Sequence, residues 1–232
     1  MQQGVKRIFR VLFIVAIIFI VLFANIIGEN SRQAVSLNAG TILIDPGHGG
    51  EDGGASAADG TLEKTLNLAI ASDLRDILTV CGLSVEMTRE TDVSIYDDGC
   101  TTTRQMKVSD MNNRLKLYDA ASLTVSIHQN HFSVSKYSGA QVFYSPSHPL
   151  SAQLATAVRE RLVTHVQPGN NRELKQATDS IFLLHRTVKP AFLVECGFLS
   201  NPQECEKLQN AIYQQQIAMA IAVGLLDVYQ CE

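Results

Sequence analysis

From residue 41 onwards, short apolar runs alternate with longer segments in which apolar residues recur at the spacing of a helix. The runs predict buried strands at residues 41–44, 123–127 and 191–194 and a further short strand at 180–184, and alternating segments predict strands at 83–88 and 139–145. The helical spacing predicts helices at residues 61–81, 105–121, 150–166, 203–210 and 211–229. Strands that alternate with helices predict a single α/β domain, with a twisted, mostly parallel sheet and helices on both faces.

The first 40 residues follow another pattern. Lys6, Arg7 and Arg10 precede an uncharged stretch from Val11 to Gly28. As a helix this stretch would span roughly 27 Å, close to the hydrocarbon thickness of a bilayer, about 30 Å. Residues 1–28 are therefore expected to be a membrane anchor or signal segment, residues 29–40 a linker, and residues 41–232 the exported domain. We favour an uncleaved anchor over a cleaved signal peptide, because no small-x-small site directly follows the apolar run.

Composition narrows the class of protein further. The formal net charge is −4, and no basic tract is present, which argues against nucleic acid as a partner. The five cysteines are scattered and include no C-x-x-C pair, so we expect no disulfide framework.

Three of the predicted buried strands lead into a polar residue of catalytic type. The first precedes the glycine-rich loop that contains His48, the second runs into His128, and the third runs into Glu195. If these strands are parallel, their carboxyl ends meet at one edge of the sheet, where α/β proteins bind ligands. Glu63 lies in the first turn of the helix that leaves the glycine loop, although an acid there also complements the helix dipole.

Two imidazoles and one carboxylate form a common catalytic zinc site. Zinc activates a water molecule and polarises a carbonyl group, and a second carboxylate can then accept the proton of that water. This set of residues therefore points to hydrolysis of an amide.

The same residues lie in segments that resemble the zinc-dependent N-acetylmuramoyl-L-alanine amidases of bacterial cell walls. The segments are Asp45-Pro46-Gly47-His48-Gly49-Gly50, Glu63, Ser126-Ile127-His128 and Val194-Glu195-Cys196-Gly197. The resemblance implies that His48, Glu63 and His128 bind zinc and that Glu195 is catalytic. It also places substrate contacts at Asn130 and Arg172. Gln129 stands where the family often has a small residue, and Glu173 where it commonly has glycine; we expect both departures to alter substrate contacts and neither to touch a ligand.

Within the family, the chain looks most like the germination-specific amidases of the spore cortex. That resemblance implies removal of stem peptides from peptidoglycan, preceding formation of muramic-δ-lactam. The domain would then act outside the cytoplasm, in the space between the forespore membranes, held by its N-terminal segment. We also hypothesise an activating accessory protein that docks near the site and raises its zinc occupancy.

Two other readings stay open. One is a non-catalytic peptidoglycan-binding protein that retains the fold, against which the intact His48, Glu63, His128 and Glu195 argue. The other is a thiol peptidase that uses Cys196. Period-two alternation points Cys196 away from the side of Glu195, and a thiol mechanism leaves Glu63 and the glycine loop without a role.

Overall fold

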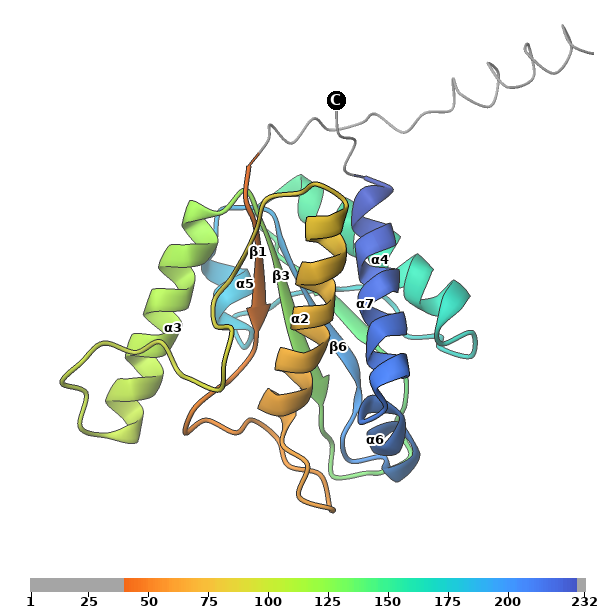
Figure 1. Cartoon of the computed structure of the whole chain (residues 1–232), viewed down its shortest axis with the longest axis horizontal. Helices are drawn as coiled ribbons and strands as arrows, with labels where there is room; N and C mark the ends of the chain where they lie inside the picture. Colours follow the sequence, from red (N-terminus) through yellow and green to blue (C-terminus); the bar gives the residue numbers. More distant parts are fainter. Residues whose placement is uncertain (1–39, 229–232) are drawn as a thin grey trace, which may run out of the picture. The chain divides into compact units, whose positions relative to one another are not determined.

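A computed structural model of the chain describes residues 40–228, which form a sheet with helices packed against it (Figure 1). The predictions for residues 1–28 and for the linker up to residue 39 lie outside the described residues. Within residues 40–228, no helix is both long and apolar enough to cross a membrane.

The sheet has six strands in the order β2-β1-β3-β6-β4-β5. The strands are β1 (Ile42–Pro46), β2 (Val85–Met87), β3 (Leu123–Asn130), β4 (Gln141–Tyr144), β5 (Lys175–Gln176) and β6 (Ala191–Phe198). β2, β1, β3 and β6 pair in parallel, whereas β4 runs antiparallel to β6. The prediction of a mostly parallel α/β sheet is therefore confirmed.

Helices cover both faces of this sheet. α7 (Ala211–Leu226) packs against both α2 (Glu63–Val80) and α4 (Pro149–His165), and α2 and α7 are seen in front of the strands in Figure 1. α3 (Thr103–Ala120) and α5 (Phe182–Arg186) contact each other on the opposite face. There a buried cluster joins Leu43 of β1 and Leu193 of β6 to Tyr118 and Leu184. The short helix α6 (Pro202–Leu208) follows β6 and contacts both β6 and α7.

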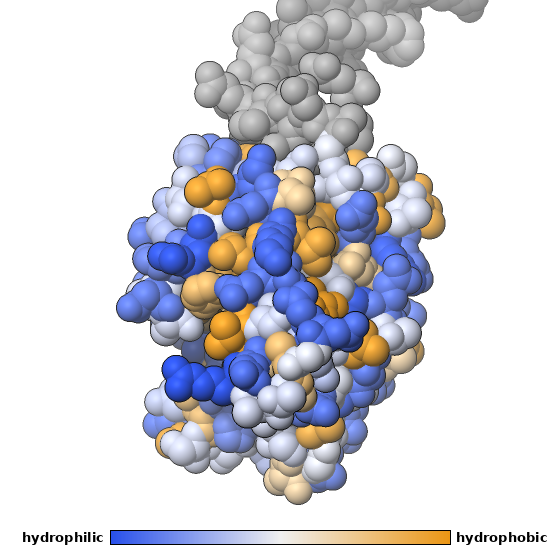
Figure 2. Space-filling view, turned by 90° about the vertical axis from the view of Figure 1, so that its left-hand side faces the viewer, coloured by the Kyte–Doolittle hydropathy of each residue, from blue (hydrophilic) through white to orange (hydrophobic). Residues whose placement is uncertain are grey.

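The surface over these elements is mainly polar. On the side of the molecule that Figure 2 shows, hydrophilic side chains make up most of the surface, and smaller apolar groups lie between them.

Two sequence predictions were wrong in detail. Residues 180–184 do not form a strand, because the chain enters helix α5 at Phe182. A short apolar run has no periodicity that separates a strand from a buried helical turn. The strand that does exist nearby, β5, was missed, since Lys175 and Gln176 are both exposed and carry no apolar pattern.

The start of α2 prepares the functional site. The predicted helix at residues 61–81 begins two residues later, at Glu63, and its N-cap Leu62 makes no capping hydrogen bond through its side chain. Glu63 is the first helical residue, and its carboxylate turns inward and accepts hydrogen bonds from the backbone N–H groups of Ala55 and Gln129. In contrast, the side chain of Asn201 caps α6, which has Pro202 at its first helical position.

Candidate active site

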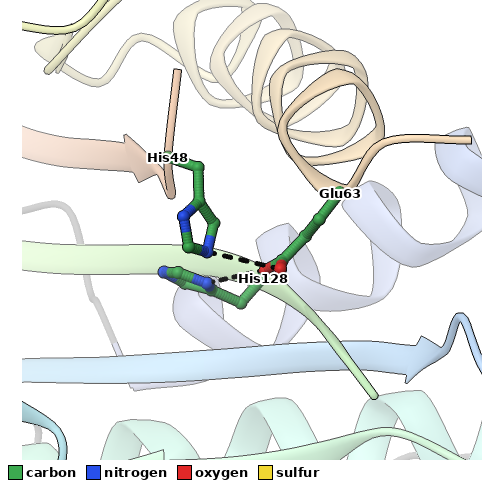
Figure 3. A group of neighbouring side chains, drawn as sticks. All are labelled: His48, Glu63 and His128. Carbon is green, nitrogen blue, oxygen red and sulfur yellow. Dashed lines mark hydrogen bonds and ion pairs between the residues drawn. The ribbon is translucent and has the colours of Figure 1, made fainter. Parts of the chain in front are cut away.

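The parallel strands bring the chemically important residues to one edge of the sheet. His128 and Glu195 lie opposite each other in the register of β3 and β6. The loop after β1 is held alongside by a hydrogen bond from the Gly47 N–H to the Ile127 carbonyl (3.0 Å). Figure 3 shows the side chains of His48, Glu63 and His128 pointing towards one another, from the β1 loop, the start of α2 and β3.

These three side chains form a compact cluster with the geometry of a metal site. His128 Nδ1 lies 2.9 Å from Glu63 Oε1, and His48 Nε2 lies 3.3 Å from Glu63 Oε2. One ligand atom from each residue falls within 4.8 Å of the others. Ligands about 2.0–2.1 Å from a tetrahedral zinc are separated by about 3.3 Å, so the cluster can hold such an ion after small side-chain adjustments.

The loop around His48 depends on glycine. A Cβ added at Gly47 would lie 2.1 Å from the His128 ring, and one added at Gly54 would lie 2.6 Å from Glu63 Oε2. Any side chain at either position would therefore displace a member of the cluster. His48 itself has φ 64°, a left-handed conformation that is uncommon for residues other than glycine.

Asp52 orients the ring of His48. Its Oδ2 lies 3.0 Å from His48 Nδ1, which leaves Nε2 to face Glu63. Metal-binding histidines usually have a carboxylate partner of this kind on the second nitrogen. Burial lowers the pKa of His48, but the hydrogen bonds to Asp52 and Glu63 outweigh it and raise the pKa to about 9.

Glu63 is the charged centre of the cluster. Burial favours its neutral form, but the hydrogen bonds and charges of His128 and His48 dominate and hold the pKa of this carboxyl well below its usual range. Glu63 is therefore an anion on an almost fully buried side chain, as a metal-binding carboxylate must be.

Glu195 lies beside the cluster but is not a member of it. Its Oε2 is buried and has no hydrogen-bond partner among the described residues. Burial raises the pKa of Glu195 from 4.5 to about 7, against the opposing effect of His128. A carboxyl group that titrates near neutral pH can both accept and donate a proton there.

A cavity of about 620 Å³ opens over these groups, with His48, His128 and Glu195 in its wall and apolar residues of α3 and α5 along one side. A larger hollow of about 760 Å³ lies elsewhere, near His131 and α6, and contains none of the four predicted residues. We assign the chemistry to the first cavity, because His48, His128 and Glu195 all line it.

Asn130, Arg172 and Cys196 are not among the residues that line this cavity. Asn130 ends β3, and its carbonyl accepts from the Leu199 N–H. Arg172 donates to the Ser138 carbonyl, and its guanidinium lies 4.4 Å from the centre of the Phe198 ring. Cys196 is fully buried, and burial together with the neighbouring Glu195 raises the pKa of its thiol far above the usual range.

Sequence reasoning missed the groups that hold the His48 loop in place. Arg114 donates to the carbonyls of Pro46 and His48 and pairs with the buried Asp45. Arg89 donates to the carbonyls of Pro46 and Gly47. Burial favours the neutral form of Asp45, but Arg114 and the hydroxyls of Tyr118 and Thr88 lower its pKa to about 2. An aspartate and two arginines that far apart in sequence give no local signal of this network.

The fold is an α/β sheet that carries acid-base residues at one edge, as in many α/β hydrolytic enzymes, beside a cluster that could hold a metal ion. Comparison with known proteins agrees: residues 42–227 match the family model described as N-acetylmuramoyl-L-alanine amidase. The chain belongs to this family and is an N-acetylmuramoyl-L-alanine amidase, an enzyme that acts on peptidoglycan.

Individual relatives are similar over most of the chain. A germination-specific N-acetylmuramoyl-L-alanine amidase of Bacillus subtilis is 35% identical over 198 residues, which cover 84% of this chain and 82% of the relative. The CwlD amidase of Clostridioides difficile, solved in complex with the GerS lipoprotein, is 42% identical with a TM-score of 0.78, over 82% of this chain and 98% of that one. AmiC2 of Nostoc punctiforme is 30% identical with a TM-score of 0.69, over 82% and 96%.

Proposed function

We propose that this amidase is zinc-dependent, that His48, Glu63 and His128 bind the zinc, and that Glu195 is the general base. The scissile bond is the amide between the lactyl group of N-acetylmuramic acid and L-alanine. The observation that carries the proposal is the buried, unpartnered Oε2 of Glu195 next to a His–Glu–His cluster.

The chemistry of the three side chains suits zinc. Two imidazole nitrogens and one carboxylate oxygen are donors that zinc prefers, and three protein ligands leave a position open for water or substrate. When bound, zinc makes water more acidic and polarises the substrate carbonyl. The carboxylate of Asp52 keeps the Nε2 of His48 available as the ligand atom.

Glu195 moves the proton in this proposal. As the carboxylate, it accepts a proton from the attacking water, and it then donates that proton to the leaving nitrogen of L-alanine. In the metal-free protein, burial raises the pKa of Glu195 to about 7. A bound cation would favour the carboxylate form, which is the form that accepts the proton. Because β3 and β6 hold His128 and Glu195 side by side, the base is fixed next to the proposed metal ligands.

The thiol alternative has little support. Cys196 is fully buried, its Sγ lies 3.8 Å from the Val194 carbonyl, and the raised pKa of its thiol leaves little thiolate at neutral pH. Nucleophilic cysteines are accessible and have lowered pKa values. A purely binding role gives no reason for the carboxyl group of Glu195 to be buried without a partner at the same site.

Substrate contacts at Asn130 and Arg172 are part of the proposal. The Arg172 guanidinium lies over the buried Phe198 ring and within 5.8 Å of the centre of the exposed Tyr137 ring, which holds a positive charge beside an aromatic side chain. A positive charge next to an exposed aromatic ring suits the combination of carboxylates and sugar rings in peptidoglycan.

For the biological role, we propose removal of stem peptides during maturation of the spore cortex, ahead of muramic-δ-lactam formation. The germination-specific relative and CwlD support this role. The proposed location is the outer face of the cytoplasmic membrane or the space between the forespore membranes, with residues 1–28 as the anchor and residues 41–232 as the catalytic domain. A reporter fused after residue 40 that is active only in the cytoplasm would overturn this location.

We also propose that an accessory protein raises the zinc occupancy of the site. The structure of CwlD with the GerS lipoprotein supports the idea of such a partner. The physical reason is that a site with three protein ligands at the edge of an open cavity can lose its metal more readily than a closed one. Full zinc occupancy and full turnover of the protein on its own would contradict the idea.

The test of the proposed roles separates zinc binding from proton transfer. Glu195→Gln cannot accept the proton, so turnover should fall by about 10²–10⁴-fold, while the zinc content stays near that of the unchanged protein. Glu206→Gln, at an exposed position of α6, is the matched control and should keep both. Loss of zinc from Glu195→Gln would make Glu195 a ligand, and retained turnover would assign the proton transfer to another group.

A further inference from the structure

Asn67 lies one turn after Glu63 on α2 and has no exposed surface. A buried amide needs hydrogen-bond partners on both its nitrogen and its oxygen. Its Nδ2 donates to the Gly47 carbonyl (3.1 Å) and lies 3.4 Å from Glu63 Oε1, and its Oδ1 accepts from Gln129 Nε2 (3.2 Å).

Each of these contacts is made next to a different member of the His–Glu–His cluster. Gly47 directly precedes His48, Glu63 is itself a member, and Gln129 directly follows His128. The backbone N–H of Gln129 also donates to Glu63 Oε1 (3.1 Å). One side chain therefore joins the β1 loop, the start of α2 and strand β3 at the point where all three supply a proposed ligand.

Gln129 supports the orientation of the Asn67 amide that the Gly47 carbonyl and the Glu63 carboxylate also favour. The amide has two orientations of nearly the same shape, and in one of them Oδ1 would face the Glu63 carboxylate and the Gly47 carbonyl. In that orientation three oxygen acceptors would face one another with no hydrogen between them, which is unfavourable. The donated hydrogen bond from Gln129 Nε2 stabilises the other orientation, in which the NH₂ group faces the carboxylate.

Gln129, which stands where the family often has a small residue, is buried beside the cluster. We expected this residue to alter substrate contacts and to leave the ligands untouched. It is instead 3% exposed and is bonded to Asn67 and, through its N–H, to Glu63. The Oε1 of Gln129 has no hydrogen-bond partner among the described residues. A substitution of Gln129 that removes this oxygen therefore breaks no hydrogen bond of the oxygen itself.

We propose that Asn67 is a positioning residue of the metal site and that Gln129 acts through it by stabilising the orientation of its amide. The proposal rests on the proposed function, in which His48, Glu63 and His128 bind zinc. Residues in this position set the orientation of the ligands before the metal arrives, and their loss typically weakens metal binding by about 10–100-fold.

The experiment measures the zinc dissociation constant of the full-length protein by competition with a chromophoric chelator. Asn67→Ala should weaken zinc binding by about 10–100-fold. Gln129→Met keeps the length of the side chain and removes the donor, so it should weaken binding in the same direction by a smaller factor. Gln214→Ala is the matched control, because Gln214 is also a buried glutamine but donates to the Leu208 carbonyl in another part of the fold.

Two further measurements test whether Asn67 and Gln129 orient the metal ligands or only stabilise the fold. The visible spectrum of the cobalt-loaded protein reports the ligand geometry and should change in both variants but not in Gln214→Ala. The double variant should bind zinc no more weakly than Asn67→Ala alone, because Gln129 acts through Asn67. Melting temperatures of the metal-free proteins show whether Asn67→Ala folds; if it does not, Gln129→Met decides.

The experiment distinguishes failure of the proposed function from failure of the proposed role of Asn67 and Gln129. Failure of the unchanged protein to bind zinc would overturn the proposed function. Normal zinc binding by the unchanged protein, together with unchanged affinity and cobalt spectrum in the folded variants, would overturn the role of Asn67 and Gln129 and leave the proposed function standing.

Discussion

Glu195 provides the sharpest prediction, because one substitution should reduce activity and increase stability at the same time. The carboxyl is buried, and burial raises its pKa to about 7 from the ordinary 4.5. Glu195→Gln keeps the shape of the side chain and removes the ionisable group. The stability effect belongs to the metal-free protein, since a bound cation would itself favour the ionised carboxylate.

The sign follows from proton binding. Between about pH 4.5 and pH 7 the folded protein holds a proton on Glu195 that the unfolded chain has lost, so its stability falls as the pH rises. The stabilising effect of the protonated group is complete below about pH 4.5 and lost above about pH 7. A pKa that lies about 2.5 above its ordinary value corresponds, at about 1.4 kcal/mol per pKa unit, to about 3 kcal/mol.

Thermal unfolding in zinc-free buffer measures this effect. For a domain of this size, about 3 kcal/mol corresponds to a melting temperature higher by on the order of 10 °C. Glu195→Gln should show this gain at pH 8 and little of it at pH 5, and Glu206→Gln should show none at either pH. A variant that is no more stable than the unchanged protein at pH 8, or equally stabilised at both pH values, would refute the burial argument.

Three other predictions follow from the same geometry. His128→Ala should lose both bound zinc and turnover; full zinc occupancy by elemental analysis would remove His128 from the ligand set. His48 has a pKa of about 9 and is therefore protonated at pH 7.5 in the metal-free protein, so zinc binding at that pH should release a proton from it. The affinity for zinc should accordingly rise with pH up to about pH 9. Calorimetry in buffers of different ionisation enthalpy counts the released protons, and a count of zero would contradict this prediction. Arg114→Met should lower the unfolding free energy by about 3–5 kcal/mol, because it leaves the buried Asp45 without its charged partner. A free energy of urea unfolding within about 1 kcal/mol of that of the unchanged protein would contradict this value.

The sequence supported those parts of the fold that rest on long periodic patterns. Helices α2, α3, α4 and α7 and strands β1, β3 and β6 lie within a few residues of their predicted positions. The site residues could be brought together on paper because parallel strands present their carboxyl ends at one edge. The short elements α5 and β5 failed, because neither is long enough for its periodicity to identify it.

The supporting contacts of the site could not be predicted in the same way. Asn67 lies on the buried face of α2 among apolar residues, and its partners Gly47 and Gln129 are about 20 and 60 residues away in sequence. Arg114 and Asp45 are likewise joined only by the packing of α3 against β1. Pairings of this kind depend on three-dimensional register, which no local pattern of residues carries.

The measurement that tests the central claim most directly is mass spectrometry of purified peptidoglycan before and after incubation with the protein. Zinc-loaded protein should release stem peptides that begin with L-alanine and leave glycan chains with free lactyl carboxyl groups. Chelation of zinc or the Glu195→Gln substitution should abolish this release. Peptides that begin at another residue, or release that is undiminished without zinc or in Glu195→Gln, would contradict the account.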